Sequence, residues 1–599
     1  MALLETHSDR SALQKSIAIG FILVAMVSIP YFFPVPLSIS RSYVAGFSNR
    51  TAILIMLFGT GLFAVFVRGR IAPQAVKDSR LSWHSLLFAL ILTLARCLRL
   101  CAFPVKLPGS EADYFINRLQ LLAAGLHPYQ QFEFVYGPFL LYPILWVQKL
   151  LHVSSTQAYA VTWTIFWLVG VFMIWVVVRE IDFPIPSRVS VFGLLVITQL
   201  IWSAYGGLSY TSFRAYFAAF CITVTYRVWT RFRRPWLVCL CAVLCIALAI
   251  CCSMDQAVGV AIGLFAFMIH LALTQKREFS WQPFALWMLA SAVCFALADR
   301  GGLTLPLRSF GGGGYAYPLL PSIPIFITLF IYIVAGCALY RGLFAAWLRK
   351  GEEGIGDPPL SGSVLVPLAL AGYSMIPNAL GRCDILHITA AIPAFVVGVA
   401  VICAMPTVWR WWFPTAILGL VLLPVLKSYI FQRLEPPSSP TPIPGGYIAN
   451  MNDNQWYVSP SDLSASELPC DRQYFSPSFM PVPTEKFLPA CLDTGYFLGF
   501  TDVITPKTIE YKINELKEHA SEPLLMENSP LEAQLPRQLA TMKTLYIECE
   551  SFWVPPVRHE PLTYAPIIEY IRKHYVEGPP IADGRLRIWY PIAAQPAGS

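Results

Sequence analysis

Two acidic residues, Glu111 and Asp113, open a segment whose residue types suit chemistry at a membrane surface. The segment covers residues 108–143 and goes on with His127-Pro128-Tyr129, Phe132-Glu133-Phe134 and Tyr136-Gly137-Pro138. A carboxylate beside aromatic rings at a membrane–water boundary suits a general base that takes the proton of a sugar or lipid hydroxyl. The same acids would also suit the first turn of an ordinary helix, because negative charge there favours the helix dipole.

Arginines form a second group of candidates, because the planar guanidinium suits phosphate binding. Arg96 and Arg99 lie three residues apart near the end of an apolar run, and therefore on one side of a helix. Charges at that depth indicate function, although snorkelling to the headgroups explains them equally well. Arg214 follows an aromatic loop, and Arg308 precedes four glycines whose backbone could approach a phosphate or sugar.

A further polar cluster spans residues 378–387 and contains Arg382, Asp384 and His387. We interpret it as a contact to the phosphate or sugar of a lipid-linked substrate, with a local ion pair that caps a helix as the alternative. Asp255 lies between two closely connected apolar runs. It is a weaker candidate, since a simple helix N-cap would also explain it.

The elements that must position these residues are membrane helices. The chain has 599 residues, of which 56% are hydrophobic and 13% charged, and its mean hydropathy is +0.57. Soluble domains carry about 25% charged residues, so this composition excludes a soluble globular enzyme, a disordered chain and a fibrous repeat. About 20 apolar residues cross a bilayer, and the candidate spans are 15–36, 51–68, 83–103, 157–178, 186–204, 213–229, 236–253, 256–273, 281–298, 319–340, 361–377, 386–404 and 409–427.

Basic loops indicate the orientation, because cytoplasmic loops carry an excess of Lys and Arg. If residues 137–152 lie along the membrane surface, every basic loop falls inside, including the arginines of 227–234. If 137–152 crosses, that cluster falls outside. We therefore expect an all-α polytopic bundle over residues 1–427 with about 13 transmembrane helices. The N-terminus would be cytoplasmic, and interfacial helices would lie in the long external loop 104–152.

The C-terminal part differs from the bundle in charge. Residues 435–599 contain 12 Lys+Arg and 20 Asp+Glu, a net charge of −8, which leaves +16 on residues 1–434. We expect a Pro-rich linker over 428–450 and a small α/β extracytoplasmic domain over 451–599. Its predicted elements are helices at 507–519 and 564–576 and strands at 523–527, 544–549 and 585–590.

Cysteine and metal chemistry are weakly indicated. Most of the 15 cysteines lie in apolar runs, where cysteine packs as a small hydrophobe. In the tail, Cys470 and Cys491 could form a disulfide if the tail is extracytoplasmic. No spacing typical of a metal site occurs. The outer acids with His127 or His387 could hold Mg²⁺ or Mn²⁺, but nothing in the sequence requires a cofactor.

The segment 108–143 resembles the first external loop of the GT-C membrane glycosyltransferases. This superfamily includes protein O-mannosyltransferases, the aminoarabinose transferase of lipid A and many bacterial polyprenyl-phosphate-dependent enzymes. The shared pattern reads here Glu111 to Asp113, Tyr114-Phe115, Ala123-Ala124, Gly125-Leu126-His127-Pro128-Tyr129, Phe132-Glu133 and Tyr136-Gly137-Pro138. The G-R-x-D-x-x-H pattern at 381–387 also resembles a late motif of these enzymes. The resemblance covers residues 90–430 and departs from the family in its two preceding spans and its E-x-D acids.

The resemblance implies an integral-membrane glycosyltransferase of a bacterial plasma membrane. It would move a hexosyl or pentosyl group, with inversion, from a polyprenyl-phosphate donor to a hydroxyl of a lipid, glycan or protein acceptor on the outer face. Either Glu111 or Asp113 would be the base. The candidate substrate-binding residues are Arg96, Arg99, Arg118, His127, Tyr129, Glu133, Tyr136, Arg214, Asp255, Arg308, Arg382, Asp384 and His387.

The alternative function is a lipid or glycan transporter or flippase without glycosyl transfer. Such proteins place substrate sites near the bilayer midplane between repeated halves. Here the charged clusters concentrate on one face, and no inverted hydropathy repeat is evident. No nucleic-acid partner is expected, because the basic residues lie among apolar segments.

Overall fold

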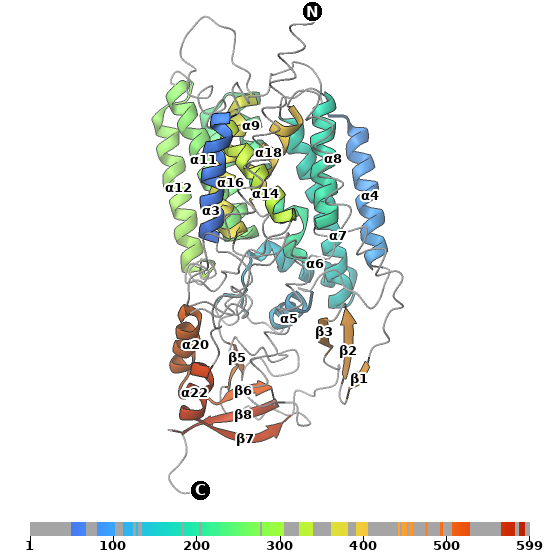
Figure 1. Ribbon diagram of the computed structural model, residues 1–599, viewed down its shortest axis with the longest axis vertical. Helices are drawn as coiled ribbons and strands as arrows, with labels where there is room; N and C mark the ends of the chain where they lie inside the picture. The colour runs from blue at the N-terminus through green and yellow to red at the C-terminus, as the bar shows by residue number, and fades with distance from the viewer. Residues whose placement is uncertain are drawn as a thin grey trace, which may run out of the picture.

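A computed structural model describes the helical bundle and parts of the C-terminal tail (Figure 1). In the bundle it describes residues 49–66, 81–101, 112–123, 127–129, 134–181, 185–202, 207–275, 278–304, 323–339, 361–380 and 391–404. In the tail it describes residues 441–443, 446–451, 454–458, 474–476, 492–494, 506–527, 565–581 and 586–592. The predicted spans 15–36 and 409–427, the predicted strand 544–549, and Cys470 and Cys491 lie outside these ranges.

Four of the described helices are long and apolar enough to cross a membrane, judged by length and composition. They are α7 (Ser155–Arg179), α10 (Pro235–Cys252), α11 (Met254–Thr274) and α12 (Trp281–Arg300). Each coincides with a predicted span to within a few residues. The total of about 13 crossings and their orientation remain predictions.

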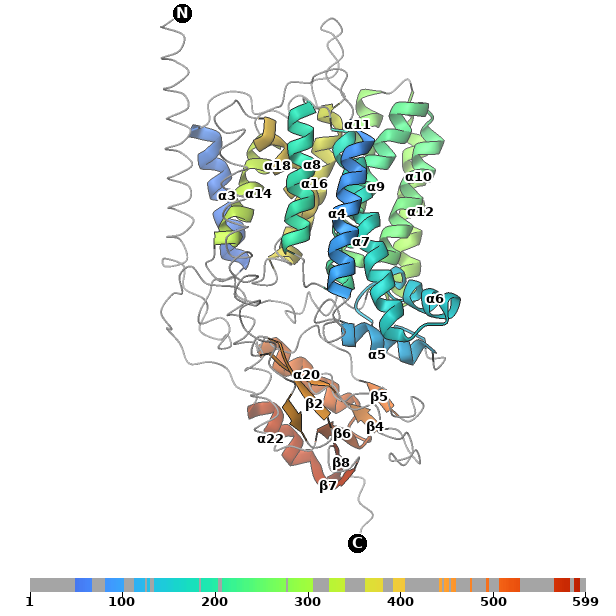
Figure 2. The ribbon, with the colours of Figure 1, turned by 90° about the vertical axis from the view of Figure 1, so that its right-hand side faces the viewer.

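The other helices of the bundle lie roughly along the same long axis (Figures 1 and 2). They are α3 (Asn49–Phe66), α4 (Trp83–Cys101), α8 (Ile185–Trp202), α9 (Ser212–Phe232), α14 (Ile323–Ala338), α16 (Ser361–Ala379) and α18 (Ile392–Ala404). Very short turns join α9 to α10 and α10 to α11. Arg233, with a left-handed φ of 51°, closes α9, and Ser253 alone separates α10 from α11.

Three short helices gather at one end of the bundle. They are α5 (Ala112–Ala123), the 3-10 turn η1 (Pro138–Leu140) and α6 (Tyr142–Leu151) (Figure 2). Since α6 has 10 residues, it is about half the length that a bilayer crossing needs. This length agrees with the prediction that 137–152 does not span the membrane. Helix α5 lies within the loop 104–152, where helices were expected.

The tail carries two small sheets and two helices beyond the end of the bundle that holds α5 and α6 (Figures 1 and 2). Strands β1 (Thr441–Ile443), β2 (Gly446–Met451) and β3 (Asn454–Val458) form an antiparallel sheet, and the first two lie at the end of the predicted linker. The second sheet has the order β5-β4-β6-β8-β7, built from Leu492–Thr494, Tyr474–Ser476, Leu524–Glu527, Leu586–Pro591 and Tyr575–Ile581.

Helices α20 (Pro506–Glu518) and α22 (Ala565–His574) pack on the five-stranded sheet. The core between them contains Phe475, Leu516 and Ile571, each with no exposed side-chain surface. Both helices and the strands β6 and β8 match predicted elements. The tail is therefore a mixed assembly of helices and strands, as expected for a small α/β unit.

Candidate functional site

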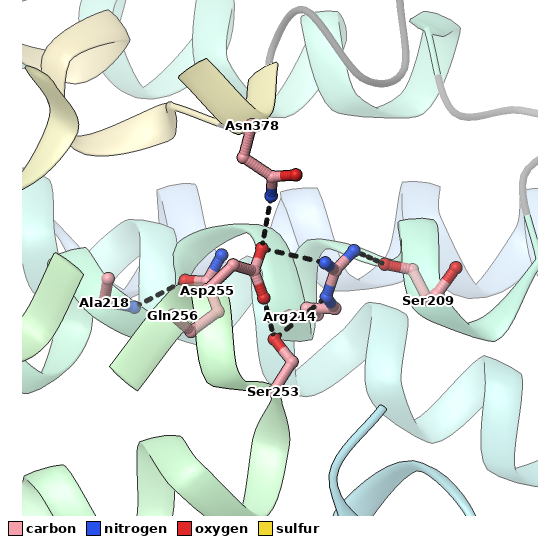
Figure 3. A network of polar contacts seen from close by, with 7 residues as sticks. All are labelled: Ser209, Arg214, Ala218, Ser253, Asp255, Gln256 and Asn378. Atoms are coloured by element: carbon pink, nitrogen blue, oxygen red, sulfur yellow. Dashed lines mark hydrogen bonds and ion pairs between the residues drawn. The ribbon is translucent and has the colours of Figure 1, made fainter. Parts of the chain in front are cut away.

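A network of polar side chains joins three helices at the end of the bundle near α5. Arg214 lies in the first turn of α9 and Asp255 in the first turn of α11, while Asn378 lies in the last turn of α16. Because two helices begin and one ends at this level, side chains far apart in sequence meet here. Figure 3 shows the Asp255 carboxylate between Arg214 and Asn378, with Ser253 beside both Arg214 and Asp255.

The Asp255 carboxylate accepts hydrogen bonds from three side chains. Arg214 Nη2 and Asn378 Nδ2 donate to Oδ2 over 2.8 and 3.0 Å, and Ser253 Oγ donates to Oδ1. Arg214 also donates from Nε to Ser253 Oγ at 3.1 Å and from Nη1 to the carbonyl oxygen of Ser209 at 3.2 Å. The charges of the ion pair are therefore surrounded by further hydrogen bonds. We call Ser209, Arg214, Ser253, Asp255 and Asn378 the polar network.

The ion pair of this network is largely removed from solvent. The Arg214 and Asp255 side chains are 16% and 11% exposed. Two charges in such surroundings are costly to desolvate unless they pair and satisfy their remaining hydrogen-bonding groups, and this pair does both. Next to it, the buried Gln256 accepts from the backbone N–H of Ala218 at 3.2 Å, which ties α11 to α9 a second time.

The segment that ends in Tyr136-Gly137-Pro138 is held against this network. The Arg214 guanidinium carbon lies 5.1 Å from the centroid of the Tyr136 ring, a cation–π distance. The Gly137 N–H donates to the Cys252 carbonyl oxygen at the end of α10 over 3.0 Å. A Cβ at Gly137 would collide with the backbone carbonyl of Cys251. This position therefore requires glycine for close backbone approach.

An aromatic cluster connects the same segment to α5. The ring of Phe115, which is fully buried, stacks on Tyr136 with centroids 5.7 Å apart and contacts Phe134 edge-on at 5.7 Å. Tyr159 of α7 lies 6.0 Å from Phe115, and the Tyr129 hydroxyl donates to the Tyr136 carbonyl at 2.5 Å. Asp113 is two residues before Phe115, so these rings hold the helix that carries one of the two candidate bases.

The structure thus brings together four of the predicted site residues: Tyr129, Tyr136, Arg214 and Asp255. The guanidinium carbon of Arg96 of α4 lies 5.2 Å from the centroid of the Trp167 ring of α7. Arg118 lies on α5 and is half-buried, and His127 is exposed. For Arg99 and Asp113 the structure describes the helix backbone alone. The predicted site residues outside the described ranges are Glu111, Glu133, Arg308, Arg382, Asp384 and His387.

Four members of this region were not singled out as site residues: Ser209, Ser253 and Gln256, and Asn378, which opens the predicted polar cluster 378–387. Their signal in the sequence is weak, because each is a single uncharged polar residue at the end of an apolar run. Their partners lie up to 123 residues away in the chain. A search for polar residues at the ends of predicted spans that share one side of the membrane would have found them.

Within the described ranges, no group of three or more His, Cys, Asp and Glu residues is placed to hold a metal ion. Asp255, the acid of the polar network, already accepts three side-chain hydrogen bonds. A divalent cation, if one binds, would need ligands from other acids.

Comparison with known proteins gives little further guidance. No protein-family model matches the chain, and no curated protein matches it. Among solved structures, the chain is similar to the oligosaccharyltransferase of Archaeoglobus fulgidus in its apo form. The TM-score is 0.37 with 12% sequence identity, over 74% of this chain and 70% of the archaeal one. A similarity at that TM-score supports no assignment for this chain.

Proposed function

We propose that this protein is an integral-membrane glycosyltransferase of the GT-C type. It would take a sugar from a polyprenyl-phosphate donor and attach it to a hydroxyl acceptor at the outer face of the membrane. The observation that supports this best is the docking of α5. This helix carries Asp113 and begins at the residue after Glu111. Aromatic rings hold it at one end of a bundle of apolar helices.

The proposed reaction is a single displacement. The carboxylate of Glu111 or Asp113 takes the proton of the acceptor hydroxyl as its oxygen attacks the anomeric carbon. The new carbon–oxygen bond forms as the bond from the anomeric carbon to the phosphate oxygen breaks. The phosphate leaves with the electron pair, and the anomeric carbon is inverted.

Cations must stabilise the phosphate as it leaves, since negative charge grows on it during bond breaking. The candidates for this role are Arg308 and Arg382, which lie outside the described residues, and Arg96 and Arg99 of α4. Arg214 has a different role in this proposal. Because it is paired with Asp255 and covers the Tyr136 ring, it would position the segment next to α5, and hence the acids, instead of holding the donor.

Substitution of the two acids tests the proposal. We expect Asp113→Asn or Glu111→Gln to abolish sugar transfer in cells and to accumulate the sugar-linked polyprenyl phosphate, measured by mass spectrometry of extracted lipids. Glu518→Gln, which removes an exposed acid from α20 in the tail, is the matched control and should leave transfer intact. Full product in both acid variants would refute the base assignment. An unchanged glycan profile with altered lipid export on deletion would favour the transporter.

A further inference from the structure

The end of the bundle opposite α5 and α6 carries a group of arginines around the turn between α9 and α10. Since α7 has 25 residues, its two ends are about 37 Å apart at 1.5 Å per residue. Its first end adjoins α6, and its last end, at Arg179 and Glu180, contacts Arg227 of α9. Arg231, Arg233 and Arg234 follow Arg227 at the end of α9 and in the turn to α10.

Two of these arginines are neutralised locally. Arg227 Nη1 lies 2.6 Å from both carboxylate oxygens of Glu180. Arg233 Nη1 lies 3.6 Å from Glu278 and donates to Gln275 Oε1 at 3.1 Å. Their guanidinium groups therefore serve to join α9 to the ends of α7 and α11.

Arg231 and Arg234 differ from these two. Both are exposed, and neither has a carboxylate within ion-pair distance among the described residues. Arg234 is also the residue from which α10 begins. α12 begins beside it, because Cys239 Sγ contacts the Pro283 carbonyl at 3.3 Å. The positive ends of two helix dipoles thus lie on the same surface as two guanidinium groups that have no carboxylate partner in the described part of the chain.

Large apolar side chains are exposed at the same ends of these helices. Trp236 in the first turn of α10 is 58% exposed, Trp281 at the start of α12 is 52% exposed, and Phe232 at the end of α9 is 54% exposed. Exposed tryptophans next to cationic residues at the ends of apolar helices are typical of the headgroup level of a bilayer. We call Arg231, Arg234, Phe232, Trp236 and Trp281 the Arg–Trp patch.

We propose that the Arg–Trp patch is a binding site for an anionic phospholipid, such as phosphatidylglycerol. The two guanidinium groups and the helix ends would hold the headgroup phosphate, and the tryptophan rings would contact the glycerol and the upper acyl chain. The site is separate from the proposed sugar-transfer site and does not depend on it, since it lies at the other end of α7, α9 and α10.

Thermal unfolding of the purified full chain in a neutral detergent, titrated with phosphatidylglycerol or phosphatidylcholine, tests the site. We expect phosphatidylglycerol alone to raise the melting temperature in a saturable way. Arg231→Gln/Arg234→Gln should weaken its apparent affinity about 25-fold, because each arginine near an anionic membrane surface contributes about fivefold. Lys149→Gln/Arg300→Gln is the matched control, since it removes two exposed positive charges at the opposite end.

Three results would overturn the proposal. The first is equal stabilisation by both lipids. The second is an equal loss of phosphatidylglycerol affinity in the control variant, which would indicate a general charge effect. The third is an equal shift with glycerol phosphate alone, which would mean that Trp236 and Trp281 add no contact with lipid. Each of these results leaves the glycosyltransferase proposal unaffected.

Discussion

Replacement of Asp255 by asparagine would remove one charge from the polar network and leave its shape nearly unchanged. The asparagine oxygen can still accept from Arg214 and Asn378, which share one carboxylate oxygen over 2.8 and 3.0 Å. The asparagine NH₂ group, which takes the place of the other carboxylate oxygen, can donate to Ser253. What is lost is the counter-ion of Arg214, whose side chain is 16% exposed.

Removal of one partner of a buried ion pair costs about 3 to 5 kcal/mol, because the remaining charge stays desolvated. The slight exposure of both groups argues for the lower end, so we expect Asp255→Asn to lose about 3 kcal/mol. Arg227→Gln provides a control of the same kind. Arg227 is 45% exposed, and such surface pairs contribute about 0 to 1 kcal/mol.

Unfolding of the purified protein in mixed micelles with increasing sodium dodecyl sulfate, followed by tryptophan emission, measures these losses. A double-mutant cycle with Arg214→Gln completes the test, because removal of both charges leaves no unpaired ion. We expect the double variant to be more stable than the sum of the single losses predicts, by about 2 kcal/mol. A coupling below about 0.5 kcal/mol would refute the view that the pair is buried and mutually dependent.

Three other predictions follow from the packing and the topology. Gly137→Ala should destabilise the protein by about 1 to 3 kcal/mol, because its Cβ would meet the Cys251 carbonyl. Gly193→Ala in α8, where a Cβ has open space, should cause no such loss of stability. Equal losses for the two variants in the same unfolding assay would contradict the close approach. Phe115→Ala should cost about 3 to 5 kcal/mol and release α5, seen as faster proteolysis within residues 102–130, and unchanged cleavage would count against the ring cluster. Topology reporters should report inside after Arg234 and outside after Gly446, and an outside signal at Arg234 would overturn the interfacial interpretation of α6.

The helices were predictable because local sequence determines them. The apolar runs 157–178 and 281–298 appear as α7 and α12. That the segment of α6 does not cross the membrane was predicted instead from the positions of the basic loops along the whole chain. Only one placement of 137–152 put every basic loop on the same side.

The polar network was only partly predictable, because its contacts join distant parts of the chain. From the sequence alone, Asp255 fits a helix N-cap as well as a site residue. In the structure Ser253 is the cap position of α11, and Asp255 reaches Arg214, 41 residues away. Arg214 was predicted to touch the donor, a role that its pairing with Asp255 makes less suitable than positioning. No local pattern reports such a pairing.

Strand β7 was not among the predicted elements, and Pro579 and Pro580 lie within it. Proline cannot donate a hydrogen bond to a neighbouring strand, so it occurs mainly at sheet edges. In the five-stranded sheet, β7 is the outermost strand and pairs with β8 alone. The two prolines therefore agree with the position of β7 at the edge of the sheet.

The same prolines limit how the sheet edge of the tail can pair with other molecules. An open sheet edge with free N–H groups can recruit a strand from another molecule, which is a common start of aggregation. Along β7, two consecutive residues offer no such donor, and the register shift between Glu577 and Pro580 interrupts the regular ladder. This edge is therefore a poor template for a newly made or partly unfolded copy of the chain. The prolines would protect the tail from self-association in the period before it has folded completely.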